Sequence, residues 1–326
     1  MSQKISSALA HPNIAFIKYW GNANPSLRLP SNGSISMNLE GLETVTSLSS
    51  STQQDTHTLT INDVVQASDK SSRIAEYLEK IRTLYPFEGF LTIRSRNNFP
   101  ISAGIASSAS AFAALALALN DFLALGLSEP EISALARLGS GSASRSIPGG
   151  YVQWEPGNDH QSSFAASIAF PTHWQLFDVI LVVTLDEKKI SSTRGHQHAD
   201  TSPYQSVRVH DTPRRLNICR QAIIDKDFEK LAWIIEQDSD MMHAVMLTSD
   251  PPIVYWQPAS LSIMQTVREL RKNGVACAYT LDAGPNVHII CPPSSKDAVL
   301  DFFSEYPGIQ EIYIAKTGGA AHIIPS

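Results

Sequence analysis

The spacing of apolar positions in the first half of the chain alternates between the period of strands and that of helices. Residues 43–62 are rich in Thr, Ser and Val with rough alternation, which predicts antiparallel strands with one solvated face. Residues 70–84 carry Ile74, Leu78 and Ile81 at helical spacing and predict a helix. Further strand patterns in this half cover 89–95, 151–155 and 177–185.

Helical patterns dominate the second half of the chain. Three helices are predicted at 205–224, 227–247 and 258–273. A strand, a turn and a strand follow in 277–291, and then a helix and two strands in 295–305, 311–315 and 319–324. Strands that gather on one side with helices packed on them define an α+β architecture. We place a domain boundary near residue 185, which gives an N-terminal domain, 1–185, and a C-terminal domain, 186–326.

Composition narrows the class of protein. The 326 residues are 43% hydrophobic and 17% charged, with a net charge of −6, which is typical of a globular protein. No basic block is present, so nucleic acid is not expected as a partner. The three cysteines form no CxxC motif, and no apolar run reaches ~18 residues. We expect a cytoplasmic protein without a membrane partner, a disulfide framework or a metal site built from cysteines.

The stretch NNFPISAGIASSASAFAALALALN, residues 97–120, places small residues before an alanine-rich helix. The first turn of a helix offers free N–H groups and a partial positive charge, which suit a phosphate. Gly104 would let a ligand approach the backbone, Ala106 adds no charge, and Ser107 and Ser108 add hydroxyl donors. A tightly packed, capped helix explains the same residues equally well. The stretch is neither a Walker loop nor a GxGxxG motif.

Five motifs resemble those of one enzyme family. FPISAGIASSAS resembles the phosphate loop of the GHMP kinase superfamily. NIAFIKYWGN, ARLGSGSASRS, KKISSTRG and YTLDAGPN resemble, in the same order along the chain, motifs of mevalonate diphosphate decarboxylases. The resemblance spans nearly the whole chain. It implies the GHMP-kinase fold, with an N-terminal α/β domain, a C-terminal ferredoxin-like domain and a cleft between them.

The resemblance also implies a reaction and residues that perform it. In this family, ATP phosphorylates the 3-hydroxyl of a mevalonate derivative, and loss of phosphate and CO₂ then makes an alkene. Asp282 matches the catalytic aspartate and Lys18 the lysine beside it, while Arg145 matches the arginine that orients the substrate carboxylate. A carboxylate can accept the hydroxyl proton, and a planar guanidinium can hold a carboxylate bidentately.

The remaining candidate residues bind substrate or nucleotide by the same resemblance. Substrate contacts are expected from Tyr19, Asn22, Arg73, Ser140, Ser142, Arg145, Ser191, Ser192 and Arg194. Nucleotide contacts are expected from Asn97, Gly104, Ala106, Ser107 and Ser108. The cofactors are then ATP and Mg²⁺, with the ion held mainly by phosphates and water rather than by protein ligands. We interpret the pair His196 and His198 as part of a solvated loop. Relatives are commonly homodimers, and we expect the same here.

The chain departs from the family pattern at positions near the expected phosphate end of the substrate. Asn22 stands where the family usually has a second lysine, and His196 where it has methionine. One cation fewer favours a substrate with one phosphate. The sequence therefore predicts decarboxylation of (R)-5-phosphomevalonate to isopentenyl phosphate. The alternatives are decarboxylation of the diphosphate to isopentenyl diphosphate, and a 3-kinase that does not decarboxylate.

Overall fold

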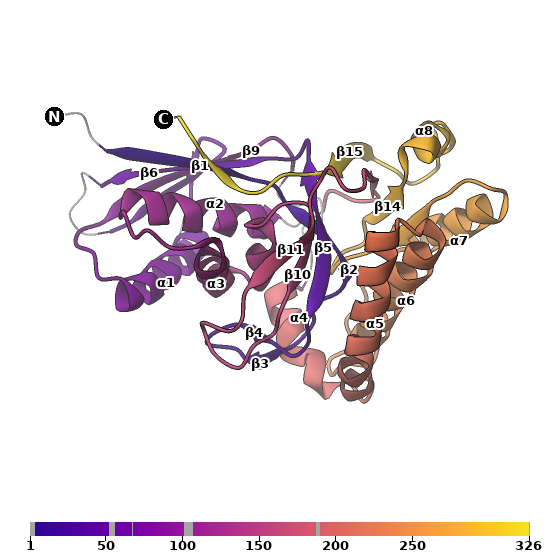
Figure 1. Ribbon diagram of the computed structural model, residues 1–326, viewed down its shortest axis with the longest axis horizontal. Coiled ribbons are helices and arrows are strands. Elements are labelled where there is room, and N and C mark those ends of the chain that lie inside the picture. Colours follow the sequence, from indigo (N-terminus) through magenta and orange to yellow (C-terminus); the bar gives the residue numbers. More distant parts are fainter. Residues whose placement is uncertain (1–3, 52–55, 67, 101–106, 187–189, 326) are drawn as a thin grey trace.

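The computed structural model describes residues 4–51, 56–66, 68–100, 107–186 and 190–325, and it confirms the α+β class. One layer is a six-stranded sheet in the order β16-β1-β6-β9-β7-β8. Its strands are β1 (Ile5–Ala10), β6 (Thr44–Ser50), β7 (Thr58–Ile61), β8 (Val64–Val65), β9 (Leu91–Asn97) and β16 (His322–Ile324). Three helices pack beside this sheet at one end of the molecule: α1 (Ser68–Leu84), α2 (Ser107–Phe122) and α3 (Glu129–Gly139) (Figure 1).

One detail of this sheet differs from the antiparallel strands predicted for residues 43–62. Strand β6 pairs antiparallel with β9, but β7 pairs parallel with β9. The chain leaves β7, passes through the short β8 and the helix α1, and returns as β9. A helix between two strands brings the second back in the same direction, which makes the pair parallel.

The second large sheet joins the two halves of the chain. Its order is β11-β10-β5-β15-β12-β14-β13, and β2 also pairs with β5. The strands are β2 (Asn13–Ile17), β5 (Ser34–Glu40), β10 (Tyr151–Trp154), β11 (Ala165–Ala169), β12 (Phe177–Val182), β13 (Ala278–Thr280), β14 (Val287–Cys291) and β15 (Glu311–Thr317). Because β15 pairs with β5 and β16 with β1, the end of the chain lies against its first strands. The boundary near residue 185 stays a prediction.

Helices cover both faces of the C-terminal part of this sheet. On β12, Ile180 and Val182 enter the core that holds α5 (Gln205–Asp225) and α6 (Phe228–Leu247). Val179 and Leu181 enter the core that holds α7 (Pro258–Lys272) and α8 (Lys296–Phe303). An uninterrupted apolar run is what a strand buried on both faces requires.

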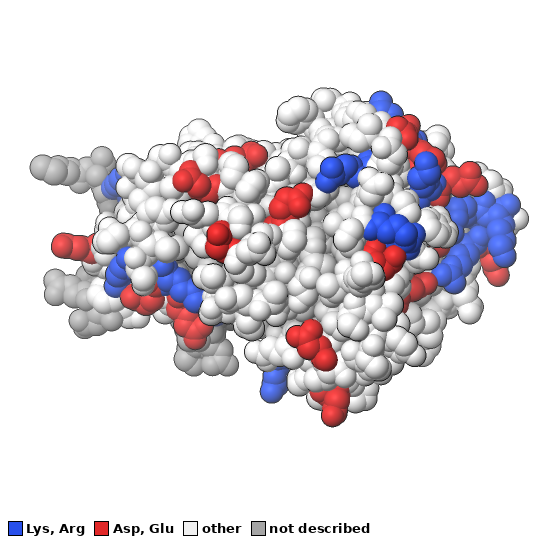
Figure 2. Space-filling model, turned by 60° about the horizontal axis from the view of Figure 1, so that its bottom comes forward, with Lys and Arg blue, Asp and Glu red and all other residues white. Residues whose placement is uncertain are grey.

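Two further features of the described residues bear on partners. No helix is long and apolar enough to cross a membrane in the parts of the chain that the structure describes. Basic and acidic side chains are intermixed on the face in Figure 2, most densely at the end that α6, α7 and α8 form in Figure 1.

A short hairpin, β3 (Asn22–Asn24) with β4 (Leu29–Pro30), lies apart from the two sheets.

Candidate active site

Strands from both halves of the chain place a lysine and an aspartate in contact. Lys18 directly follows β2, and Asp282 follows β13 at the start of a sharp turn. The Lys18 Nζ donates to Oδ1 of Asp282 at 2.6 Å. The Lys18 side chain is 1% exposed and that of Asp282 27%, so the pair opens to solvent through the carboxylate. The carboxylate is therefore the part of the pair that a ligand can reach.

The charges of this pair are coupled. Burial acts to raise the pKa of Asp282, but the ammonium of Lys18, with His288 and Arg145, outweighs it and holds that pKa below its usual 3.8. Burial lowers the pKa of Lys18 below its usual 10.5 and outweighs the attraction of Asp282 and Asp238. Asp282 is consequently a carboxylate at neutral pH, which is the form that can accept a proton.

Arg145 lies in the 3₁₀ helix Gly141–Ser146 and is almost completely buried. Its Nε donates to Oδ1 of Asn13 at 3.2 Å, and its Nη1 to the hydroxyl of Ser34 at 2.7 Å. These two bonds fix the plane of the guanidinium. A guanidinium has five N–H groups, so the remaining ones can bind a carboxylate near Asp282. Burial lowers the pKa of Arg145, and the charge of Asp282 acts to raise it, so the two groups interact.

Three serine hydroxyls meet between α2 and the Arg145 segment. Ser108 in the first turn of α2 lies 3.4 Å from the hydroxyl of Ser140, and Ser140 lies 3.3 Å from that of Ser142. The first turn of α2 contains no acidic residue. The hydroxyl of Thr44 donates to Oδ1 of Asn97, which ties the end of β9 to the neighbouring strand β6. The described first turn of α2 and the three serine hydroxyls therefore carry no negative charge, which suits an anion.

The structure describes three of the five expected nucleotide-binding residues, and the first of them, Asn97, ends β9. Ser107 and Ser108 begin α2, as expected. Gly104 and Ala106 lie outside the described residues. A group of His, Cys, Asp and Glu that could hold a metal ion is absent from the described ranges. Mg²⁺ that is bound to ATP is held mainly by phosphates and water, so such a metal requires no dedicated group of protein ligands.

Tyr19, Asn22 and His196 form a second cluster beside Lys18. The Tyr19 hydroxyl donates to Oδ1 of Asn22 at 2.5 Å. The ring of His196 stacks on Tyr19 at 4.2 Å and lies 4.5 Å from Trp20, centroid to centroid. The N–H of Gly21 donates to Nδ1 of His196 at 3.0 Å, so Nε2 carries the ring proton when the imidazole is neutral.

The interpretation of His196 as part of a solvated loop is wrong. His196 belongs to the helix α4 (Ser192–His198) and packs on two aromatic rings. Burial and then the nearby arginines, Arg28 foremost, lower its pKa to about 3. His196 is thus a neutral ring at physiological pH. The sequence signal for it was its position in the family motif, where methionine is usual; spacing alone does not reveal it.

The other polar residues expected at the phosphate end lie on α4 or beside α3. Ser191 caps α4, and its hydroxyl accepts from the N–H of Arg194 at 3.3 Å; Ser192 is the first helical residue. All three are exposed, and they form a helix start rather than the expected polar loop. Arg73 donates to the carbonyl of Gly139 at 3.0 Å, where it caps the end of α3. The structure therefore places Arg73 next to the serine cluster, bound to protein.

Comparisons with known proteins agree with this geometry. The family model described as "Diphosphomevalonate decarboxylase-like N-terminal domain" matches residues 10–165, and "Mevalonate 5-diphosphate decarboxylase C-terminal domain" matches 178–320. The diphosphomevalonate decarboxylase of Candida albicans is 40% identical, over 98% of this chain and 94% of the relative. The Saccharomyces cerevisiae enzyme is 37% identical, over 94% of this chain and 84% of the relative.

Solved structures match as closely. The mevalonate diphosphate decarboxylase of Enterococcus faecalis superposes with a TM-score of 0.93 at 35% identity, covering 100% of both chains. That of Staphylococcus aureus gives 0.93 at 35% identity, covering 99% of both. A structure described as "MDDEF in complex with MVAPP, AMPPCP and Magnesium" gives 0.94 at 35% identity, covering 100% of both chains.

The fold and the site define an ATP-dependent enzyme of the GHMP-kinase fold, with an N-terminal and a C-terminal domain and a carboxylate paired to a lysine where the two halves meet. Within that class, the chain belongs to the diphosphomevalonate decarboxylase family.

Proposed function

We propose that the protein converts (R)-5-diphosphomevalonate, ATP and Mg²⁺ to isopentenyl diphosphate, CO₂, ADP and phosphate. The observation that carries the proposal is the contact of Lys18 with Asp282 beside Arg145, in a chain whose curated relatives of high coverage are diphosphomevalonate decarboxylases. A structural relative with an ATP analogue and magnesium supports the choice of cofactors. When bound, ATP supplies the phosphoryl group that turns the 3-hydroxyl into a leaving group.

Asp282 acts on the 3-hydroxyl in this proposal. Its Oδ1 is held by Lys18, and its other oxygen can accept the hydroxyl proton. Lys18 keeps the carboxylate ionised because its ammonium lowers the pKa of Asp282, against the effect of burial. The buried ammonium also offsets negative charge that gathers when phosphates approach. Both roles require that Lys18 and Asp282 stay in contact, and their 2.6 Å hydrogen bond meets this requirement.

Arg145 orients the carboxylate that leaves as CO₂. Its guanidinium is fixed by Asn13 and Ser34, so little side-chain freedom is lost when a substrate binds. When the bond to the carboxylate breaks and CO₂ leaves, the electron pair of that bond forms the double bond of the alkene as phosphate departs from the neighbouring carbon. An orientation that aligns the two bonds that break speeds this step.

Polar side chains around this centre would hold the phosphates. The serine cluster of Ser108, Ser140 and Ser142 lies beside the start of α2, where a nucleotide phosphate fits. The exposed Arg194 on α4 is a cation suited to the 5-phosphoryl end of the substrate. Homodimerisation and a cytoplasmic location stay predictions.

A second candidate substrate is (R)-5-phosphomevalonate, with isopentenyl phosphate as product. The observation that favours it is Asn22, a neutral side chain that bonds Tyr19 where the family usually has a lysine. The adjoining His196 is neutral as well. Because His196 stands where the family has the equally neutral methionine, only the loss of the cation at Asn22 favours fewer phosphate charges, whereas the relatives favour the diphosphate.

Rates of CO₂ release from the two substrates test the choice. We would measure kcat/KM for each, with saturating ATP and Mg²⁺. A ratio of at least a hundredfold toward the diphosphate, about 2.8 kcal/mol of discrimination, supports the proposal. A ratio of that size toward the monophosphate overturns it and assigns the second candidate. Formation of ADP without CO₂ from either substrate identifies a 3-kinase instead.

A further inference from the structure

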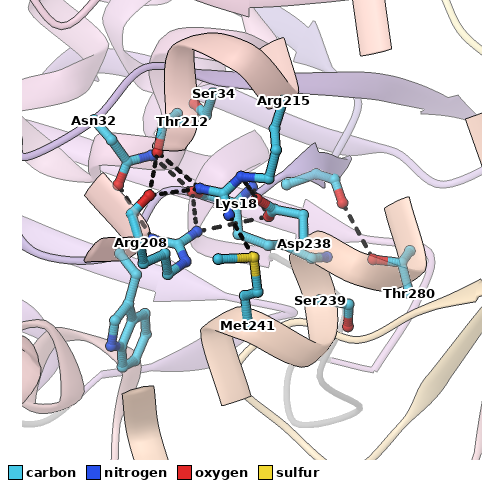
Figure 3. A network of polar contacts seen from close by, with 12 residues as sticks. Lys18, Asn32, Ser34, Arg208, Thr212, Arg215, Asp238, Ser239, Met241 and Thr280 are labelled. Carbon is cyan, nitrogen blue, oxygen red and sulfur yellow. Dashed lines mark hydrogen bonds and ion pairs between the residues drawn. The ribbon is translucent and has the colours of Figure 1, made fainter. Parts of the chain in front are cut away.

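A buried carboxylate holds the backbone of Lys18. Oδ2 of Asp238, in α6, accepts from the Lys18 N–H at 2.6 Å. Two buried arginines of α5 flank the same carboxylate: Arg208 Nη2 lies 3.6 Å from Oδ2, and Arg215 Nε lies 3.3 Å from Oδ1. Figure 3 shows these side chains converging on Lys18. Asp238 is 0% exposed, so its charge is screened by protein groups rather than by water.

Side chains also bind the Lys18 carbonyl. Arg208 Nη2 donates to it at 2.8 Å and Asn32 Nδ2 at 3.0 Å. Arg208 Nη1 donates in turn to Oδ1 of Asn32 at 3.2 Å. The described pairing of β2 with β5 ends at Ile17, so side chains take over the backbone groups of Lys18 where the ladder stops.

The next residue of α6 holds the backbone beside Asp282. The Ser239 hydroxyl accepts from the N–H of Leu281 at 3.0 Å and lies 3.4 Å from the carbonyl of the same residue. Asp238 and Ser239, consecutive residues of α6, therefore bind the two chain segments that carry Lys18 and Asp282. A shift of this turn would change the Nζ–Oδ1 distance directly.

We propose that Asp238 and Ser239 are positioning residues that set the contact between Lys18 and Asp282, with Arg208 and Arg215 holding the Asp238 carboxylate in place. Stability alone does not explain the arrangement, because a buried ion network is often no more stabilising than apolar side chains of the same volume. A catalytic pair that must keep one separation does explain it. The proposal deepens the proposed function and rests on it for its kinetic part only.

The charge of Asp238 also acts on the Lys18 ammonium. The charged or titratable groups that bear on Lys18 are Asp282, Asp238, Arg145, Arg208 and His243. Burial lowers the pKa of Lys18, whereas Asp282 and, after it, Asp238 raise it. Removing the charge of Asp238 must lower the pKa of Lys18 further. A purely structural carboxylate far from the pair would leave that pKa unchanged.

The pKa of Lys18 can be read without any substrate. We would record NMR titrations of protein labelled with ¹³C at lysine Cε and assign the Lys18 signal by its loss in Lys18→Met. Asp238→Asn keeps the shape of the side chain and removes the charge. The expected result is a lower Lys18 pKa, and an unchanged value overturns the proposal. This outcome does not depend on which reaction the enzyme catalyses.

Kinetics separate positioning from folding. Asp238→Asn should lower kcat at least tenfold, leave the KM of both substrates within threefold, and move the alkaline limb of kcat to lower pH. The matched control is Asp240→Asn, which removes a carboxylate of the same helix that pairs with Arg268, at 2.9 Å. The control should lose thermal stability and keep kcat within twofold. An equal loss of kcat in both variants overturns the proposal.

Ser239→Ala keeps the test decisive if Asp238→Asn does not fold. It deletes one hydroxyl and leaves the ion network intact. We expect kcat to fall at least fivefold with unchanged KM. An unaltered kcat in a folded Ser239→Ala protein overturns the proposal.

Discussion

The ammonium nitrogen of Lys18 lies 2.6 Å from Oδ1 of Asp282, although 264 positions separate the two residues in the chain. The contact exists because β2 and β13 both end at α6, which packs on both strands. Asp282 is thereby ionised and oriented at once.

Replacing Asp282 removes the proton acceptor and keeps the shape. Asp282→Asn should bind the substrate with a Kd within a few fold of wild type but lose turnover by roughly 10²–10⁴, the usual contribution of a positioned base. Single-turnover assays and calorimetric binding would measure the two quantities. Near-normal turnover in this variant would reject the assignment.

The planar fork of Arg145 should be irreplaceable. Arg145→Lys keeps the charge, but the single nitrogen of an ammonium cannot replace the separate Nε and Nη1 that reach Asn13 and Ser34, nor hold a carboxylate with two parallel bonds. We expect kcat/KM for CO₂ release to fall roughly 100-fold, since a hydrogen bond to a charged group contributes about 1.5–3 kcal/mol. Arg94→Lys, on the exposed face of β9, is the control and should change nothing. Activity retained in Arg145→Lys would assign carboxylate binding to another residue.

The pH profile should reflect the charge of Lys18. Its ammonium lowers the pKa of Asp282, whereas burial acts in the opposite direction. In Lys18→Met burial still raises the pKa of Asp282, and only the weaker lowering effects of His288 and Arg145 oppose it, so this pKa rises. The acid limb of kcat, which falls as Asp282 is protonated, should then move to higher pH. Measuring kcat from pH 4 to 9 checks this, and a limb that stays in place would show that Lys18 does not control Asp282.

Asn22 offers a test of the phosphate end. Asn22→Lys restores the cation usual in the family and should raise the ratio of kcat/KM for diphosphate over monophosphate about tenfold. Tyr19→Phe is a useful companion, because it frees Asn22 from its bond without adding charge. It should leave the ratio nearly unchanged. If Asn22→Lys does not change the ratio, this position does not contact the outer phosphate.

Close packing at Gly141 should make the Tyr19 cluster sensitive to a single methyl group. A Cβ at Gly141 would lie 2.6 Å from Cε1 of Tyr19, closer than such contacts allow. Gly141→Ala should therefore displace the Tyr19 ring, destabilise the fold by about 1–3 kcal/mol and raise the KM of the substrate. Gly319→Ala meets open space and serves as the control. Denaturant titration with steady-state kinetics measures both effects.

The helices could be predicted from the sequence because their apolar spacing is local. The predicted 205–224, 227–247 and 258–273 correspond to α5, α6 and α7 within a few residues. Long-range pairing has no such signal. The parallel partner of β7 depends on the crossover through α1, and the junction of β15 with β5 depends on the whole fold.

The site was only partly predictable for the same reason. Resemblance to a family points to Lys18, Asp282 and Arg145, which the structure brings together. Periodicity alone predicts for Lys18 only an ordinary lysine whose aliphatic chain is buried and whose ammonium reaches solvent. The bonds of Asn13 and Ser34 to Arg145 have no sequence signal, because small polar residues within strands carry no functional pattern. The environment of His196 has none either, because its stacking on Tyr19 is a tertiary contact.

The stoichiometry of one turnover tests the proposed reaction most directly. Purified protein would be mixed with ATP, Mg²⁺ and (R)-5-diphosphomevalonate labelled with ¹⁴C in its carboxylate, and ADP, phosphate and ¹⁴CO₂ would be counted together. We expect one of each per turnover, at a rate lower by roughly 10²–10⁴ in Asp282→Asn. ADP formed without ¹⁴CO₂, or ¹⁴CO₂ released without ATP, would overturn the proposed reaction.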